Sequence, residues 1–165
     1  MEFKIKERVE FEVRLEKGEN GRKKIVRFLR NSVKENIVRK SEDNTPILKQ
    51  YNGENRSSKN QLFFMAYSNG GKVVGACVSE IYGKGLLRLD LLTVKKEHQR
   101  QGVGLAIIIY IISYAKKNGI HNIQCISLIS DKRSKKFLKK AGFKKAGKLK
   151  KYLGKQDYYI WEYLP

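Results

Sequence analysis

The feature that most constrains the fold of this 165-residue chain is an apolar segment that directly follows a polar turn with two glycines. The segment runs from Val103 to Ala115 and is followed by two lysines. It is shorter than the roughly 20 apolar residues that a bilayer span needs. We therefore expect a buried helix behind this turn, preceded by a strand at residues 86–94.

The remaining patterns predict an α+β fold in which residues 1–165 form a single domain. Glycine-containing turns separate three strand-like runs, as in an antiparallel meander. A turn is expected at residues 18–21, and a polar surface loop with a short helix at 41–60. Strands are predicted at residues 9–15, 61–68, 72–82, 86–94, 122–130, 143–153 and 156–164, and helices at 22–40, 105–119 and 131–142. This order predicts a mixed, mostly antiparallel sheet with helices on both faces.

The first residues and the cysteines of the chain suggest its location in the cell. The first residues lack the apolar region of a secretion signal, so we expect a cytoplasmic protein with no membrane partner. Cys77 and Cys125 lie in apolar runs and are expected to be buried, reduced thiols. Two cysteines with this spacing do not make a metal site, and no metal is expected.

The charge of the chain is large and uneven. The net charge is +20, and the stretch from Lys132 to Lys155 has twelve lysines or arginines and no acidic residue. Such a face attracts polyanions: the phosphates of a cofactor, nucleic acid or an acidic protein. A solvated lysine-rich surface without a specific partner is the alternative.

The glycine turn itself suits a phosphate. Backbone N–H groups and the positive end of the following helix dipole favour an anion, and Gly102 and Gly104 keep side chains away from those groups. Arg100, Lys95 and Lys96 add positive charge. A plain strand-to-helix turn is the alternative. The nucleotide P-loop and the dinucleotide fingerprint are both excluded, because neither glycine pattern is matched.

Residues 92–106, "LTVKKEHQRQGVGLA", closely resemble the cofactor motif of the GNAT superfamily of N-acetyltransferases, Gln/Arg-x-x-Gly-x-Gly/Ala after a strand that ends in valine. Residues 130–147, "SDKRSKKFLKKAGFKKAG", look like the second signature of that family, a basic helix closed by Ala-Gly-Phe. The resemblance covers residues 60–163 well and the first third of the chain loosely.

The resemblance implies that the chain binds acetyl-CoA as a cosubstrate. The end of the strand would contact the pantetheine arm, and the N–H of Val94 would polarise the thioester carbonyl. The turn would hold the diphosphate, and the basic helix from Lys132 to Lys140 would meet the 3′-phosphate. The expected cofactor-binding residues are Leu92, Thr93, Val94, Gln99, Arg100, Gln101, Gly102, Val103, Gly104, Leu105, Asp131 and Ser134.

The attacking amine must lose a proton, so a base or a water chain helps. Asp90 is the first candidate, because many relatives carry an acid at this position and alternation would place it on the same face as Leu92 and Val94. A salt bridge to Arg88 is the structural alternative. Glu80 is the second candidate.

Two positions depart from the family pattern. Leu138 stands where relatives commonly have a tyrosine acid, and Asp131 stands where an asparagine is usual. Two alternatives are open for the leaving thiolate: it needs no dedicated acid, or Tyr152, Tyr158 or Tyr159 supplies its proton.

The resemblance favours an N-acetyltransferase that acts on a primary amine by direct attack in a ternary complex. The alternatives are a basic nucleic-acid-associated binding module on the same scaffold and a CoA-binding regulator without catalysis. Expected partners are acetyl-CoA, an amine acceptor that is a small molecule or a protein, a polyanion or nucleic acid at the Lys132–Lys155 face, and a second copy of the chain.

Overall fold

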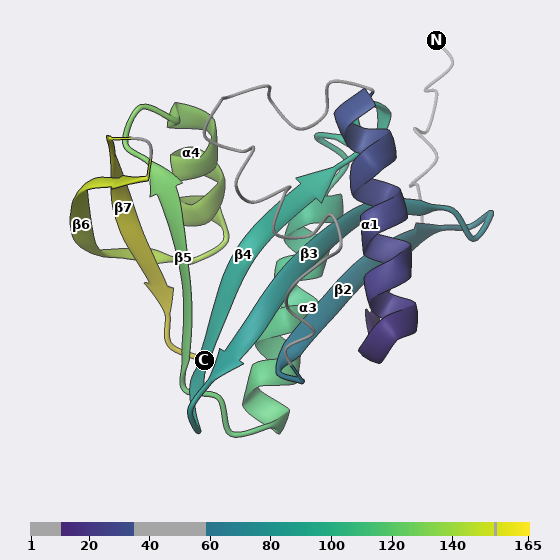
Figure 1. Cartoon of the computed structure of the whole chain (residues 1–165), viewed down its shortest axis with the longest axis horizontal. Helices are drawn as coiled ribbons and strands as arrows, with labels where there is room; N and C mark the ends of the chain where they lie inside the picture. Colours follow the sequence, from purple (N-terminus) through teal and green to yellow (C-terminus); the bar gives the residue numbers. More distant parts are fainter. Residues whose placement is uncertain (1–10, 35–58, 154) are drawn as a thin grey trace, which may run out of the picture.

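The computed structural model describes residues 11–34, 59–153 and 155–165. Within these ranges the chain forms one seven-stranded sheet, three α-helices and a short 3-10 helix (Figure 1). The order of elements agrees with the order predicted from the sequence. The elements are β1 (Phe11–Glu16), α1 (Gly18–Lys34), β2 (Gln61–Ser68), β3 (Val73–Tyr82), β4 (Leu86–Val94), η2 (Lys96–His98), α3 (Val103–Lys117), β5 (Asn122–Leu128), α4 (Lys132–Lys140), β6 (Lys144–Leu153) and β7 (Gln156–Tyr163).

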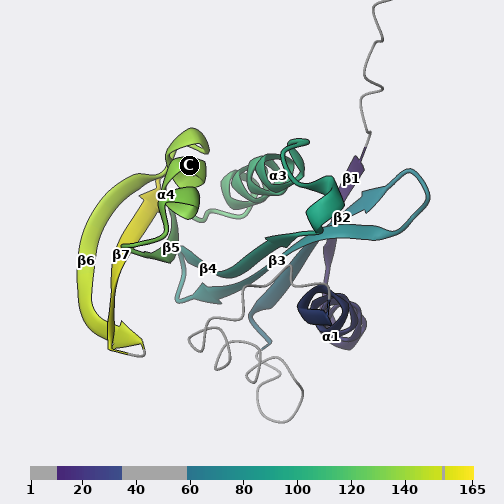
Figure 2. The same ribbon diagram turned by 90° about the horizontal axis from the view of Figure 1, so that it is seen from above.

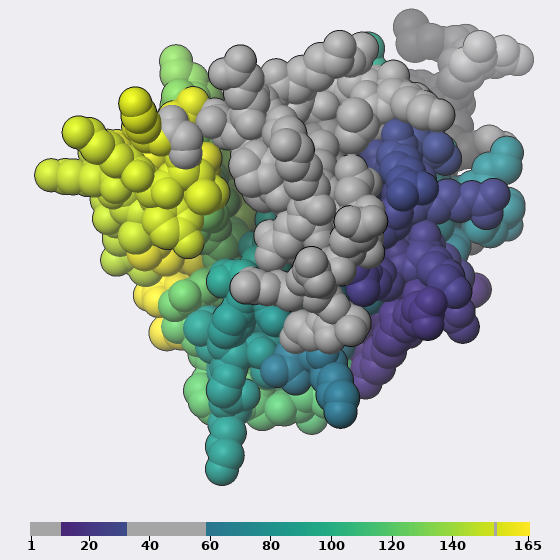
Figure 3. Space-filling view, in the orientation of Figure 1, coloured from purple at the N-terminus to yellow at the C-terminus, as the bar shows by residue number. Residues whose placement is uncertain are grey.

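The sheet is mixed and mostly antiparallel, as predicted. Its strand order is β1-β2-β3-β4-β5-β7-β6, and the pairing of β4 with β5 is the parallel one. Helix α1 covers one face, and α3 and α4 cover the other (Figure 2). The predicted α+β fold with helices on both faces is therefore confirmed. In the space-filling view, β6 and β7 form the left edge of the molecule and α1 lies on the right (Figure 3).

Each face of the sheet has its own core. On the α3 side, the buried residues of the helix recur at the spacing of a helical face, and they pack with Leu87, Leu89 and Leu138. The other core joins Ile25, Phe28 and Leu29 of α1 to β2 and β3. Helix α3 is not buried all round, because Ile109 is 59 % exposed and Tyr110 is 37 % exposed.

The turn predicted at residues 18–21 is wrong, because these residues form the first turn of α1. Gly18 has a left-handed backbone with φ of 65°. At Gly21 a Cβ atom would lie 2.9 Å from a ring carbon of Phe63 and 3.0 Å from atoms of Glu16. The glycines therefore let the helix start directly after β1 and lie close against the sheet. The predicted loop at 41–60 and the predicted helix beyond Lys34 fall almost entirely outside the described residues.

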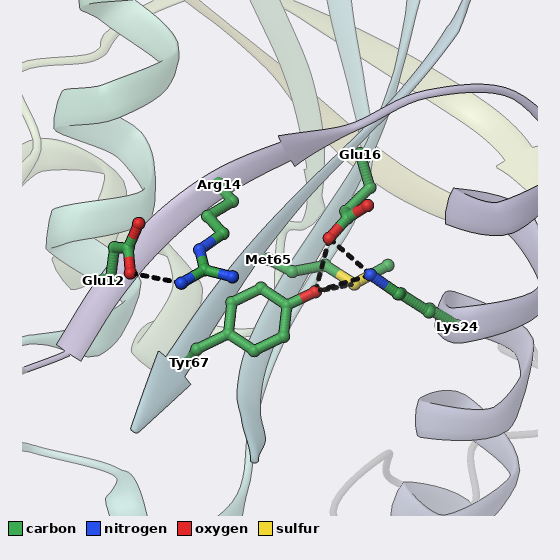
Figure 4. Close-up of polar contacts among 6 residues, drawn as sticks. All are labelled: Glu12, Arg14, Glu16, Lys24, Met65 and Tyr67. Carbon is green, nitrogen blue, oxygen red and sulfur yellow. Dashed lines mark hydrogen bonds and ion pairs between the residues drawn. The ribbon is translucent and has the colours of Figure 1, made fainter. Parts of the chain in front are cut away.

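A polar cluster fastens α1 to strands β1 and β2 (Figure 4). The carboxylate of Glu16 accepts hydrogen bonds from Lys24 Nζ and from the Tyr67 hydroxyl, both at 2.7 Å. The guanidinium carbon of Arg14 lies 5.1 Å from the centroid of the Tyr67 ring. The hydrogen bond from Lys24, followed by that from Tyr67, lowers the pKa of Glu16. The ionised carboxylate thus links β1 to the adjacent helix α1 and to Tyr67 of β2, which lies 51 residues away in sequence.

Both cysteines are buried free thiols, as expected. Burial is the main cause that raises the pKa of Cys77, and it raises the pKa of Cys125 to about 12. Neither thiol therefore ionises readily near neutral pH. In the segments that the structure describes, no helix is both long and apolar enough to span a membrane.

Candidate active site

Strands β4 and β5 separate half-way along their length. Their parallel pairing runs from Leu86 opposite Asn122 to Leu89 opposite Cys125, and both strands continue beyond it. Residues 90–94 and 126–128 therefore diverge, as Figure 1 shows. Among the residues that the structure describes, no other strand pairs with the side of β4 that faces β5 over its last residues.

The backbone of Val94 points its N–H toward this separation. The N–H of Lys95 donates to Val74 O of β3 at 2.8 Å. Because successive N–H groups of a strand point to opposite sides, the N–H of Val94 points away from β3 and toward β5. The sequence analysis expected this N–H to polarise a thioester carbonyl, and its direction is compatible with that role.

Strand β4 carries a bulge at Asp90. The pairing with β3 shifts between Leu89, opposite Ser79, and Leu91, opposite Val78, so Asp90 is the additional residue. Leu89 and Leu92 both reach the core under α3, although they are three residues apart. The expectation that alternation places Asp90 on the face of Leu92 and Val94 is therefore wrong, because a bulge interrupts the alternation.

Asp90 instead joins Arg88 and the second candidate base in one polar cluster. Arg88 Nε donates to Asp90 Oδ1 at 2.6 Å, and Arg88 Nη2 lies 3.8 Å from Glu80 Oε2. The Tyr82 hydroxyl donates to the same Glu80 oxygen at 2.6 Å. Burial, followed by the bond to Glu80, raises the pKa of Tyr82 to about 12. The structural alternative for Asp90, a salt bridge to Arg88, is present.

The turn ahead of α3 has the backbone that an anion site needs. Arg100 and Gly102 both have a left-handed backbone, with φ of 65° and 88°. Gly102 is the N-cap of α3 and makes no capping hydrogen bond through a side chain. The first N–H to bond back to Gly102 O is that of Ala106, at 2.9 Å. The N–H groups of residues 103–105 come before that bond, at the positive end of the helix.

Gly104 has a packing role in addition to the expected one. A Cβ atom at this position would lie 3.4 Å from the Phe137 ring of α4 and 3.7 Å from Val94 of β4. Three elements of the candidate site therefore meet at Gly104, and a bulky side chain there would displace Phe137.

Gln99 connects β4, the turn and α4 through hydrogen bonds that were not predicted from the sequence. Its Nε2 donates to Val94 O at 2.9 Å, and its Oε1 accepts from Arg133 Nη2 of α4 at 2.6 Å. The carbonyl of Val94 lies on the same side of β4 as its N–H. The Gln99 amide therefore occupies the hydrogen-bonding edge of β4 at its last residue. Gln99 belongs to the recognised motif, but Arg133 lies 34 residues away in sequence, so no local pattern links the two.

Asp131 and Ser134 form the N-terminal cap of α4. Asp131 Oδ1 accepts from the backbone N–H groups of Arg133 and Ser134, both at 3.0 Å. The Ser134 hydroxyl donates to Asp131 Oδ2 at 2.7 Å. The carboxylate thus occupies the amides that a phosphate would use at this helix, and a contact of these two residues with the cofactor stays a prediction.

The candidate proton donors differ in their surroundings. Leu138 is buried in the core under α3. Tyr158 and Tyr159 lie opposite Leu128 and Ser127, on the part of β5 that has separated from β4. Tyr152 is exposed on β6. Among the described residues, no group of three or more His, Cys, Asp or Glu is placed to hold a metal ion.

The mixed sheet with helices on both faces and two diverging parallel strands defines an α+β class of fold. The chain belongs to the acetyltransferase (GNAT) family, whose family model matches residues 27–143. No curated protein sequence matches the chain significantly.

Solved structures share the fold at low sequence identity. A GNAT-family protein from Desulfovibrio desulfuricans is 15 % identical with a TM-score of 0.74, covering 94 % of this chain and 99 % of that one. A chimera of the Vibrio cholerae spermidine N-acetyltransferase is 17 % identical with a TM-score of 0.71, covering 92 % and 95 %. A Bacillus anthracis protein assigned as a streptothricin acetyltransferase, solved with acetyl coenzyme A, is 19 % identical with a TM-score of 0.60. That last match covers 66 % of this chain and 65 % of the other.

Proposed function

We propose that the protein transfers an acetyl group from acetyl-CoA to a primary amine by direct attack in a ternary complex. Membership of the GNAT family supports the reaction class. The observation that carries the proposal is the start of α3, where the backbone turns left-handed at Arg100 and Gly102 and the N-cap residue, Gly102, has no side chain to cap the helix. Such a helix start favours a diphosphate.

The chain's own groups suggest how the cosubstrate would lie. The N–H groups of residues 103–105 would hold the diphosphate, and the exposed Arg100 would add charge. The pantetheine arm would lie beside the open edge of β4, at Leu92 and Thr93. Gln99 already bonds the carbonyl of Val94, so this carbonyl would not be available to the arm. The N–H of Val94 would then meet the thioester oxygen as negative charge develops there.

A carboxylate of the polar cluster around Arg88 would take the proton of the amine. In this step the amine nitrogen attacks the thioester carbon, the C–S bond breaks, and the amine proton passes to a carboxylate directly or through water. Asp90 and Glu80 are both candidates, and Arg88 holds both near one another. The proton for the leaving thiolate would come from water or from a tyrosine of β7, because the side chain of Leu138 has no acidic proton to donate.

Thiol release tests the proposal directly. The protein is incubated with acetyl-CoA and a panel of amines, amino acids and peptides, and free thiol is followed over time. We expect amine-dependent release, and we expect calorimetry to show acetyl-CoA binding that Arg100→Ala weakens. The absence of both binding and release would refute the proposal.

A CoA-binding regulator is the second candidate function. It is favoured by one observation, the salt bridge that neutralises Asp90, together with the leucine at position 138. Binding of acetyl-CoA without thiol release for any amine in the panel would support this alternative.

A further inference from the structure

A strongly basic surface of the described residues is formed by α4 and the edge strand β6, and it adjoins the candidate site at Arg133. We call it the α4–β6 basic surface. All but one of its twelve basic residues are exposed, the half-buried one being Lys135, and the sequence between its ends has no acidic residue. In Figure 3, long side chains of β6 project from this edge. Its residues are Lys132, Arg133, Lys135, Lys136, Lys139, Lys140, Lys144, Lys145, Lys148, Lys150, Lys151 and Lys155.

One aromatic ring joins the two halves of this surface. The Nζ atom of Lys145 on β6 lies 4.6 Å from the centroid of the Tyr159 ring, and that of Lys135 on α4 lies 5.8 Å away. Two cations on one ring bring the charges of the helix and of the strand together. At physiological ionic strength charges within about 8 Å of one another act jointly, so a polyanion would meet one continuous field.

Two of the acidic residues that flank the surface have structural roles, and a third, Glu162, lies opposite Lys144 in the pairing of β6 with β7. Asp131 caps α4. Asp157 Oδ2 pairs with Lys148 at 2.8 Å, and its Oδ1 accepts from the backbone N–H of Lys151 at 3.0 Å. Lys151 has a left-handed backbone, with φ of 49°, so Asp157 holds the irregular end of β6 in shape. These carboxylates thus organise the basic elements and neutralise little of their charge.

An exposed aromatic ring stands among the lysines of β6. Tyr152 is 52 % exposed and follows Lys150 and Lys151 in sequence. Its ring packs edge-on against Tyr158, with centroids 6.1 Å apart, which fixes its position on the face of β6 and β7 opposite to that of Tyr159. Lysines alone attract any polyanion, whereas an ordered aromatic ring beside them offers a stacking platform for unpaired bases.

We propose that the α4–β6 basic surface binds single-stranded nucleic acid, with its lysines on the phosphates and Tyr152 stacked on a base. The surface is separate from the carboxylate cluster of the candidate site. Binding there does not depend on whether the protein transfers acetyl groups.

Fluorescence anisotropy with a labelled 20-nucleotide RNA, and with DNA of the same sequence, tests the proposal in the full-length protein. If about five phosphates are neutralised, the logarithm of the association constant should fall with the logarithm of salt concentration with a slope of about −3.5. The RNA and DNA arms show which sugar the surface prefers. Binding of either with this salt dependence supports the proposal.

A charge-matched pair of variants locates the site. Both lose five positive charges by Lys→Gln substitution at exposed positions. The test variant changes Lys136, Lys139, Lys140, Lys144 and Lys150, and the control variant changes Lys59, Lys72, Lys84, Lys116 and Lys117. We expect the test variant to lose roughly tenfold or more in affinity relative to the control, with a shallower salt slope. Equal losses in the two variants would overturn the proposal, because net charge alone would then explain binding.

Tyr152→Ala separates nucleic acid from other polyanions. We expect it to weaken binding of the oligonucleotides about fivefold or more while leaving binding of inorganic polyphosphate unchanged. An unchanged oligonucleotide affinity would show a surface for polyanions in general and would overturn the proposal. Binding to anionic phospholipid vesicles or to a polyglutamate peptide, without binding to either oligonucleotide, would overturn it in favour of that partner.

Discussion

Replacing Gln99 with leucine tests whether the link between β4, the turn and α4 positions the candidate site. The substitution keeps the approximate size of the side chain and removes both hydrogen bonds. The bond from Nε2 to Val94 O at 2.9 Å is partly buried, and such a bond contributes about 1 kcal/mol. The bond from Arg133 is exposed and is expected to orient the amide more than to stabilise it.

A loss of about 1 kcal/mol of positioning at Val94 corresponds to about a fivefold fall in kcat/KM, if the Val94 N–H acts in the transition state. Steady-state kinetics with acetyl-CoA measure this change, and hydrogen exchange of residues 92–95 reports the loosened strand end. Gln156→Leu is the matched control, because Gln156 is exposed at the start of β7 and is not a residue of the candidate site. Equal kinetics for the two variants would refute the positioning role.

Three further predictions concern stability. Glu16→Gln should lower the melting temperature near pH 7, and the difference from wild type should shrink as the pH falls below 4.5. The lowered pKa of Glu16 means that its contribution to stability is lost as the carboxylate is protonated. We discount the contribution to about 1 kcal/mol because the side chain of its partner Lys24 is 49 % exposed and solvent screens the pair. A difference that stays constant as the pH is lowered from 7 to 3 would contradict this explanation. Gly21→Ala should destabilise the fold by about 1–3 kcal/mol in urea unfolding, because the new Cβ would lie within 3.0 Å of Phe63 and of the Glu16 backbone. Gly70→Ala is the control and should leave the stability unchanged, because its new Cβ would meet only a side-chain oxygen at 4.0 Å. Neither cysteine should react with a thiol reagent until the protein unfolds, since both thiols are buried, and fast reaction of the native protein would contradict the packing of this core.

The elements of the fold were predictable because their signals are local. The alternation in β1 and the spacing of Ile25, Phe28 and Leu29 in α1 each follow from one face being buried. The motif at Gln99–Gly104 was equally readable, because the left-handed backbone at Gly102 favours glycine. The start of α1 was not predictable from the sequence, because two glycines close together are typical of a turn. The close contact of Gly21 with Phe63 is visible only in the structure.

The candidate site depended on features that the sequence does not mark. Nothing in "LLRLDLLTV" distinguishes the bulged residue from its neighbours, because the bulge is set by the pairing of β4 with β3. The bond between Gln99 and Arg133 arises only when α4 lies beside the turn. The residues of the site were therefore readable from the sequence, and their relative orientation was not.

The bulge and the divergence of β4 occur at the same place, and this coincidence can be tested by deleting Asp90. The parallel pairing with β5 ends at Leu89, and the additional residue on the β3 side follows immediately. A bulge bends its strand and increases its twist, so we infer that Asp90 turns β4 away from β5. Deletion would leave Leu89 opposite Ser79 and Leu91 opposite Val78, and the fold should survive. The straightened β4 should then bind acetyl-CoA at least tenfold more weakly by calorimetry. Asp90→Asn keeps the bulge and removes the charge, so it should preserve affinity and lower kcat if the carboxylate is the base. Wild-type affinity in the deletion variant would show that the strands diverge for another reason.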